Sequence, residues 1–216
     1  MADLGTLKGG TYSEGFGVNN AGQVTGSSAQ GDDPYSHAFL YSGGIMTDLG
    51  TLGGLGSEGL AINNTGQVTG DFAGNGYEHA FLYNAGVMTN IDTLGNYSTG
   101  LAINSAGQVV GEFGPNSSYY RAFLYRDGRM IDLTSVLQPK DGSYFYLDGG
   151  MGINDFGQIV VTINVNGFDR ALLLTPVPEP QIHVLLLIGL ATIAARSRSR
   201  LIPGRSTRAR WLLSKR

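Results

Sequence analysis

One ten-residue phrase occurs four times along this chain, and its repetition limits the folds that the chain can adopt. It reads GVNNAGQVTG at 17–26, AINNTGQVTG at 61–70, AINSAGQVVG at 102–111 and GINDFGQIVV at 152–161. Repetition at intervals of roughly 40–50 residues is typical of repeat proteins, in which each repeat forms one supersecondary unit. We therefore expect a repeat architecture rather than a core built from unrelated elements.

Inside this phrase, a turn separates two short stretches of alternating apolar and polar residues. Asn64, Thr65 and Gly66 fit a hairpin loop, because Asn bonds nearby backbone and Gly adopts a positive φ without steric cost. The equivalent glycines of the other copies are Gly22, Gly107 and Gly157. The apolar positions that we expect to face the core between units are Val18, Ile62, Ile103 and Ile153.

Two further phrases complete each unit. The first is HAFLY at 37–41 and 79–83, RAFLY at 121–125 and RALLL at 170–174. The second is DLGTL at 3–7 and 48–52, NIDTL at 90–94 and DLTSV at 132–136. Runs of strand formers bounded by Gly-bearing turns predict strands, and the 34 glycines among 216 residues disfavour helices. Four short strands per unit predict an all-β fold, a small β-propeller.

The predicted repeat domain covers residues 3–175. Its units span about 8–52, 53–94, 95–137 and 138–175. The fourth unit has no DLGTL phrase of its own and carries an insertion at 138–148. Residues 3–7 could therefore supply its last strand and close a four-bladed ring, since closure removes exposed sheet edges. The alternative is that the four units belong to a longer ring.

The composition changes after Thr175. Pro176, Pro178 and Pro180 are incompatible with a strand ladder or a helix interior, so the repeat domain ends there. Residues 182–195 are mostly apolar, but shorter than the roughly 20 residues of a membrane-spanning helix. We expect a short apolar helix there. The cluster Arg196, Arg198 and Arg200 follows it directly, and such charge favours the cytoplasmic side of a membrane.

Charge is divided unevenly along the chain. Residues 1–180 carry 17 acidic and six basic side chains, whereas residues 181–216 carry eight basic side chains and no acidic one. The acidic body would repel phosphate, so we expect no nucleic-acid partner. The chain has no Cys, which excludes disulfides and cysteine metal sites.

The motif Val177, Pro178, Glu179 and Pro180, the apolar stretch and the Arg cluster together resemble the PEP-CTERM sorting signal of Gram-negative bacteria, over residues 176–200. The repeats of the body resemble the HAF-repeat family of extracellular proteins. These resemblances imply export, transient anchoring in the inner membrane by residues 182–195, and processing by an exosortase-type membrane enzyme. They imply a non-enzymatic cell-surface or matrix protein, associated with exopolysaccharide and biofilm, that needs no cofactor.

Two features depart from that pattern. The start, MADLGTLKGGTY, has neither the basic region nor the apolar region of a secretory signal peptide. A basic extension, residues 201–216, follows the Arg cluster, where such signals normally end. We therefore expect a reading frame that has lost its signal peptide, and a truncated gene remnant is the alternative.

No catalytic, cofactor or metal site is predicted. His37 and His79 suggest metal ligands, but Arg121 and Arg170 occupy the equivalent positions and protonated Arg does not bind metals. A polar role at strand edges or between units is the favoured interpretation. The first residue of each DLGTL phrase could be a calcium ligand, or it could form turns and hydrogen bonds between units, which is the favoured interpretation. These residues are Asp3, Asp48, Asn90 and Asp132.

A glycan-binding lectin or adhesin is the competing function. It would use the loops 27–36, 71–78 and 114–120, which we expect at one end of the units. The insertion adds Tyr144 and Tyr146, whose rings could stack on sugars or pack against the fourth unit.

Overall fold

The computed structural model describes residues 1–95, 97–115, 120–136, 147–165 and 168–176. Contacts divide the chain into two units, Met1–Thr175 and Pro176–Arg216. Several predictions lie outside the described residues: the sorting motif Val177–Pro180, the apolar helix at 182–195, the Arg cluster, the extension 201–216, and Tyr144 and Tyr146.

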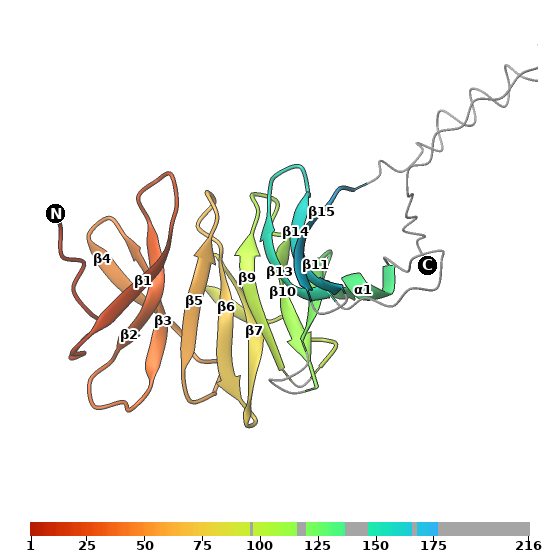
Figure 1. Cartoon of the computed structure of the whole chain (residues 1–216). Helices are drawn as coiled ribbons and strands as arrows, with labels where there is room; N and C mark the ends of the chain where they lie inside the picture. The colour runs from red at the N-terminus through yellow and green to blue at the C-terminus, as the bar shows by residue number, and fades with distance from the viewer. Residues whose placement is uncertain (96, 116–119, 137–146, 166–167, 177–216) are drawn as a thin grey trace, which may run out of the picture. The chain divides into compact units, whose positions relative to one another are not determined.

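The all-β prediction is confirmed, and the strands form four separate antiparallel sheets that follow one another in chain order (Figure 1). Sheet 1 consists of β1 (Ser13–Val18), β2 (Val24–Ala29), β3 (Ser36–Ser42) and β4 (Ile45–Gly50). Sheet 2 consists of β5 (Ser57–Ile62), β6 (Val68–Gly74), β7 (Tyr77–Asn84) and β8 (Val87–Asn90). In both sheets the spatial order of the strands is their order along the chain.

Sheets 3 and 4 repeat this meander. Sheet 3 consists of β9 (Tyr97–Ile103), β10 (Val109–Gly114), β11 (Arg121–Arg126) and β12 (Arg129–Asp132), and a short helix, α1 (Leu133–Val136), follows it. Sheet 4 contains three strands, β13 (Leu147–Ile153), β14 (Ile159–Val165) and β15 (Phe168–Leu174).

The repeated phrase forms the hairpin between the first two strands of each sheet. In sheet 2 the N–H of Gly66 donates to the carbonyl of Asn63 at 3.1 Å, and Gly66 has a φ of +80°. The side-chain oxygen of Asn63 accepts from the N–H groups of Thr65 and Gln67. Asn therefore shapes the loop and Gly supplies its left-handed residue, as the sequence predicts.

The same asparagines join each sheet to the next. The Nδ2 of Asn19 donates to the carbonyl of Asn63, that of Asn63 to the carbonyl of Asn104, and that of Asn104 to the carbonyl of Asn154. The donor–acceptor distances are 3.0, 2.9 and 3.2 Å. These four turns line a shallow groove of about 290 Å³.

The core lies between successive sheets. We call the side of a sheet that faces the preceding sheet its N-face and the opposite side its C-face. Ala38, Leu40 and Leu49 on the C-face of sheet 1 pack against the N-face of sheet 2. The residues that they meet there are Ile62, Val68, Phe72, Phe81, Tyr83 and Met88. Equivalent residues form the clusters between sheets 2 and 3 and between sheets 3 and 4.

Two predictions about the first and fourth units are wrong in this structure. Residues 3–7 do not complete sheet 4: the buried Leu7 lies against sheet 1, where its N–H donates to Ser28 Oγ at 2.9 Å. Ile62, Ile103 and Ile153 do pack against the clusters, but Val18 is 70% exposed. Val18 differs because it lies on the N-face of the first sheet, which no earlier sheet covers.

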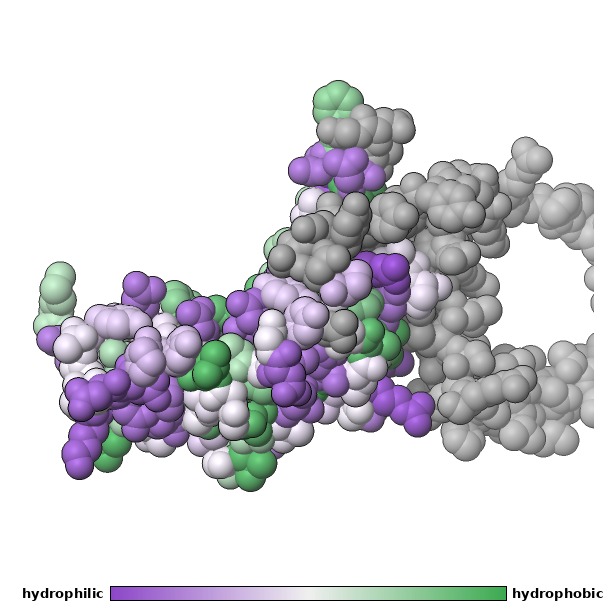
Figure 2. All heavy atoms as spheres, turned by 90° about the horizontal axis from the view of Figure 1, so that it is seen from below, coloured by the Kyte–Doolittle hydropathy of each residue, from purple (hydrophilic) through white to green (hydrophobic). Residues whose placement is uncertain are grey.

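Hydrophilic and hydrophobic residues are mixed on the surface. In the view of Figure 2, hydrophilic and hydrophobic side chains are interspersed over the described part of the face. The exposed large hydrophobic residues include several on the first and fourth sheets, among them Phe16, Val18, Phe168 and Leu173.

Candidate functional site: a tyrosine-lined acidic cleft

A cleft on the described surface crosses sheets 1, 2 and 3. Its larger part, about 690 Å³, is lined by Leu55, Asn75, Tyr77 and Glu78 among others. A second part of about 400 Å³ shares Ala73, Glu78 and Tyr97 with the first, so the two form one cleft. This second part is also lined by Tyr35, Ser36, Glu58, Asp71, Thr99 and Glu112.

A tight turn places two of the lining side chains. Asn75 and Gly76 have φ values of +52° and +83°, which is the pattern of a type I′ hairpin loop between β6 and β7. Because Tyr77 and Glu78 follow this turn directly, they lie at the mouth of the cleft. Tyr77 is 44% exposed, so its ring is accessible to a ligand.

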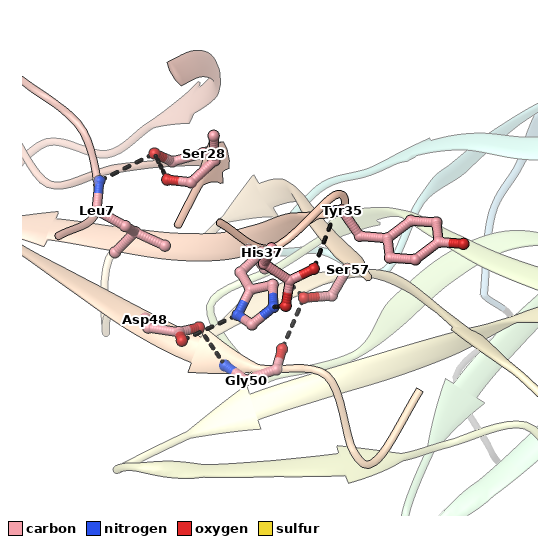
Figure 3. A network of polar contacts seen from close by, with 10 residues as sticks. Leu7, Ser28, Tyr35, His37, Asp48, Gly50 and Ser57 are labelled. Atoms are coloured by element: carbon pink, nitrogen blue, oxygen red, sulfur yellow. Dashed lines mark hydrogen bonds and ion pairs between the residues drawn. The ribbon is translucent and has the colours of Figure 1, made fainter. Parts of the chain in front are cut away.

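Tyr35 comes from the loop between β2 and β3. The N–H of Tyr35 donates to Asp33 Oδ1 at 3.0 Å, which fixes the backbone of the loop. Its ring is 45% exposed and points away from the His37–Asp48 pair (Figure 3). Tyr35 therefore offers an aromatic face to the cleft from the first sheet.

Carboxylates gather beneath these rings. Glu58 on β5 and Asp71 on β6 are directly opposite in the strand register, and both line the cleft with Glu78 and Glu112. Burial is the main cause that raises the pKa of Asp71 to about 7, and the nearby charges of Glu78 and Glu58 raise it further. A hydrogen bond from Thr99 opposes this shift. The pKa of Glu58 is also raised, first by burial and then by Glu14 and Glu78.

Tyr97 closes the cleft from sheet 3. Burial raises the pKa of its hydroxyl above the ordinary range, and hydrogen bonds with Glu78 and Tyr120 raise it further. The rings of Tyr97 and Tyr120 are 5.3 Å apart between centroids and inclined by 59°. Tyr97 is therefore a neutral hydrogen-bond donor held in place by its neighbours.

Tyrosine rings and carboxyl groups in one cleft can contact a ligand in two different ways. Aromatic rings offer flat apolar faces, whereas carboxylates accept hydrogen bonds from hydroxyl groups. Asp71, with a pKa of about 7, can hold a proton near neutral pH and then also donates. Such a cleft suits a polyhydroxylated ligand without negative charge, because the acidic cluster would repel an anion.

The histidines of the HAFLY phrase lie elsewhere and have a structural role. His37 Nδ1 lies 3.0 Å from Asp48 Oδ2, and His79 Nδ1 lies 3.1 Å from Asp92 Oδ2. In sheet 3, Arg121 Nη1 donates to Asp132 Oδ2 at 3.3 Å. The first residue of the phrase thus pairs with an acid in the last strand or the loop that follows it, which explains how Arg replaces His.

The acids of the DLGTL phrase also form turns. Asp48 Oδ1 accepts the N–H of Gly50, and Asp132 Oδ1 accepts the N–H of Thr134, two residues further on. Asp3 and Asn90 make the same contact with Gly5 and Asp92. The favoured turn role is confirmed. The contacts of Asp48 with His37 and of Asp132 with Arg121, however, lie within one sheet rather than between sheets. Among the described residues, no three His, Asp or Glu side chains are grouped to hold a metal ion.

The loops named in the sequence-based glycan hypothesis can be located in the structure. Two of the three loops that it named, 27–36 and 71–78, contribute to the cleft. Tyr144 and Tyr146, its named contacts, lie outside the described residues, as do positions 116–119 of the third loop.

Sequence reasoning missed the acidic cluster. Glu58, Asp71 and Glu78 come from three different strands of the second repeat, and Glu112 comes from the third repeat. A signal was present: aligning the repeats places Ser27, Asp71, Glu112 and Thr162 one residue after the Gly-Gly-Gly-Val position of the second strand. Only the middle two repeats carry an acid there.

Comparison with protein-family models and with curated proteins found no match to this chain. In the part of the chain that the structure describes, no helix is long and apolar enough to cross a membrane.

Proposed function

We propose that this protein is a non-enzymatic carbohydrate-binding repeat protein of a Gram-negative cell surface or extracellular matrix. The observation that carries the proposal is a cleft with Tyr35, Tyr77 and Tyr97 in its walls and Glu58 and Asp71 in its second part. The tyrosine rings would stack on sugar faces, and the carboxyl groups would bind hydroxyls. We propose that the four sheets are arranged like propeller blades in an array that is open within one chain, because residues 3–7 do not join sheet 4.

Binding can be tested with a panel of neutral, aminated and acidic oligosaccharides on an array, followed by calorimetry on the best binder. We expect neutral or aminated glycans to bind and acidic ones to be rejected. Tyr77→Ala and Tyr35→Ala should each weaken binding about two- to twelvefold, because an aromatic stacking contact contributes on the order of 0.5–1.5 kcal/mol. Tyr12→Ala is the matched control, since Tyr12 is 50% exposed and does not line the cleft. Equal loss in all three variants would argue against the cleft.

The resemblance of residues 176–200 to a sorting signal supports a second part of the proposal. The chain would be exported, held by residues 182–195 in the inner membrane and processed near Pro178–Glu179–Pro180 by an exosortase-type enzyme. Mass spectrometry of the protein from its native cells tests this by mapping both termini in each fraction. A C-terminus near Pro180 in the envelope or medium supports sorting, whereas an intact 216-residue chain in the cytosol contradicts it.

One observation favours a second candidate function, glycoside hydrolysis. A carboxyl with a pKa near 7 beside other carboxylates is the arrangement of a general acid in many glycosidases. Asp71 would then protonate the leaving glycosidic oxygen, and Glu58 or Glu112 would be the second carboxylate of the reaction, as general base or nucleophile. Chromogenic glycosides test this: turnover that Asp71→Asn removes, with glycan binding retained, would establish an enzyme.

A further inference from the structure

The three sheet-to-sheet interfaces of this protein use the same residues in the same places. On each C-face, the Ala and Leu of the HAFLY phrase point toward the next sheet and lie in its cluster. These pairs are Ala38 with Leu40, Ala80 with Leu82, and Ala122 with Leu124. They meet an aliphatic and aromatic N-face, which in sheet 2 includes Val68 and Phe81.

The C-face of sheet 4 carries the same residue types, and no sheet among the described residues packs on it. Ala171 and Leu173 occupy the places of Ala122 and Leu124, yet Leu173 is 63% exposed where Leu124 is 7% exposed. Val160 is 37% exposed, while its counterpart Val110 is fully buried. This apolar face is therefore half of an interface of the kind that the chain builds three times.

The N-face of sheet 1 is the other half. Val18 there is 70% exposed, whereas Ile62, its counterpart in sheet 2, packs against sheet 1. The segment 3–10 contacts sheet 1 in the way that the segment 48–54, which includes the end of β4, contacts sheet 2. The shared contact is a serine hydroxyl that donates to a glycine carbonyl, Ser13 to Gly5 at 2.7 Å and Ser57 to Gly50 at 2.6 Å.

Polar groups on the two faces are complementary as well. In the first two of the three internal interfaces, the N–H of Ala38 donates to Ser57 Oγ and the N–H of Ala80 donates to Ser98 Oγ, each at 2.9 Å. The corresponding acceptor on sheet 1 is Ser13 Oγ, and the corresponding donor on sheet 4 is the N–H of Ala171.

The partners of one further contact lie on the two outer faces. In sheet 3, Arg121 on β11 pairs with Asp132, the last residue of β12 and the first of its DLGTL phrase. Sheet 4 contains the counterpart of Arg121, namely Arg170. The counterpart of Asp132 in the segment that lies on sheet 1 is Asp3.

We infer that the C-face of sheet 4 binds the N-face of sheet 1, with residues 1–10, in a second copy of this chain. The second copy is the occupant because residues 3–7 lie on sheet 1 of their own chain and are not paired with β15. The joint would place Leu173 on Val18, bring Ala171 N–H to Ser13 Oγ, and pair Arg170 with Asp3. Such a head-to-tail contact extends into a filament, or into a ring if the rotation between copies closes.

Cross-linking tests this contact directly, because the chain contains no cysteine of its own. Full-length Asp3→Cys and Arg170→Cys variants are mixed and treated with a short bis-maleimide. We expect a cross-linked dimer in the mixture, whereas Asp3→Cys mixed with the control Arg126→Cys should give none. A double Asp3→Cys/Arg170→Cys variant that links only within single chains at every concentration would show self-closure and overturn the proposal. The absence of any cross-link would also overturn it.

Sedimentation of interface variants gives an independent test. Val18→Asp blocks the sheet 1 end and Leu173→Asp blocks the sheet 4 end, so each variant alone should be monomeric. Their equimolar mixture should form a dimer and nothing larger, because one intact joint can still form. Val87→Asp is the control, since Val87 is 62% exposed in the β7–β8 hairpin, and it should associate like the unmodified protein. Association that persists in either blocked variant alone would place the contact elsewhere and contradict the inference.

Discussion

At the scale of single residues, this protein depends on polar side chains whose place is set by the repeat. Asn63 is 5% exposed and uses its whole amide: the oxygen accepts two backbone N–H groups, and the nitrogen donates to Gln67 and to the next repeat. Asp71 shows the opposite situation, a carboxyl whose surroundings disfavour its charge. One residue stabilises the joint between sheets, whereas the other costs stability and is a candidate for ligand binding.

Asn63→Ala should lower the free energy of unfolding by about 2–4 kcal/mol, because it removes several hydrogen bonds, including one of the two that the carbonyl of Asn104 accepts. The matched control is Asn154→Ala. Asn154 makes the same turn but is exposed, so we expect a loss of about 1 kcal/mol or less. Urea denaturation measures both, and similar losses for the two variants would count against the role of Asn63 in joining sheets.

Asp71 should make stability depend on pH. The folded protein keeps the Asp71 proton up to about pH 7, whereas the unfolded chain releases it near the ordinary pKa of 3.8. Stability should therefore fall as the pH rises from about 4 to about 7. Asp71→Asn should reduce this slope and raise the free energy of unfolding at pH 8 by on the order of 1–3 kcal/mol. Denaturation at several pH values checks this, with the exposed Asp32→Asn as control; an unchanged slope in Asp71→Asn would contradict it.

At the scale of elements, each strand has the same task in every repeat. The third strand places a large side chain on the N-face and a small one on the C-face, so that one sheet's Ala meets the next sheet's Phe. Phe81 and Phe123 are fully buried in consequence, and Phe39 on sheet 1 is 1% exposed although no sheet precedes it. The division between faces follows from the alternation of side chains along a strand.

Phe81→Ala should lower the free energy of unfolding by about 3–5 kcal/mol, because it leaves a cavity in the joint between sheets 1 and 2. Phe168→Ala, at a ring that is 70% exposed, should change it by less than about 0.5 kcal/mol. Thermal and urea denaturation distinguish the two. A small effect of Phe81→Ala would mean that sheets 1 and 2 are not held together as described.

At the scale of the whole molecule, the four sheets form a linear series of near-equivalent interfaces. Each sheet contacts mainly its neighbours, so stability should be close to a sum of sheets and joints, as in other repeat proteins. The first and fourth sheets each retain one apolar face, and the inferred contact between copies follows from this arrangement. The Met1–Thr175 unit contains all four sheets.

A shortened protein that ends at Thr175 should therefore unfold at the same temperature as the full chain, to within about 2 °C, because a 1 kcal/mol change would shift the midpoint by about 2–4 °C. Calorimetry of the two proteins in the same buffer measures this. A much lower midpoint for the shortened protein would show that residues 176–216 stabilise the sheets.

The sequence alone determined the features that are local and repeated. Asn and Gly at the turn of each phrase, and alternation in the strands beside it, require backbone conformations that neighbouring residues dictate, so the hairpins and the four sheets could be predicted. The polar role of His37 and Asp48 followed from the substitution of Arg121 at the same place. Their pairing within one sheet did not follow, because it depends on strand register.

Only the tertiary structure decided how the repeats combine. Residues 3–7 match the phrase that sheet 4 lacks. The sequence could not show whether they join sheet 4 or lie on sheet 1, because their residue pattern is compatible with both positions. The acidic cleft was hidden for a related reason: the β5–β6 register places Glu58 opposite Asp71, and the packing of sheet 3 on sheet 2 adds Glu112. Burial, which gives Asp71 its raised pKa and leaves Leu173 exposed, is a property of neighbours in space and not of neighbours along the chain.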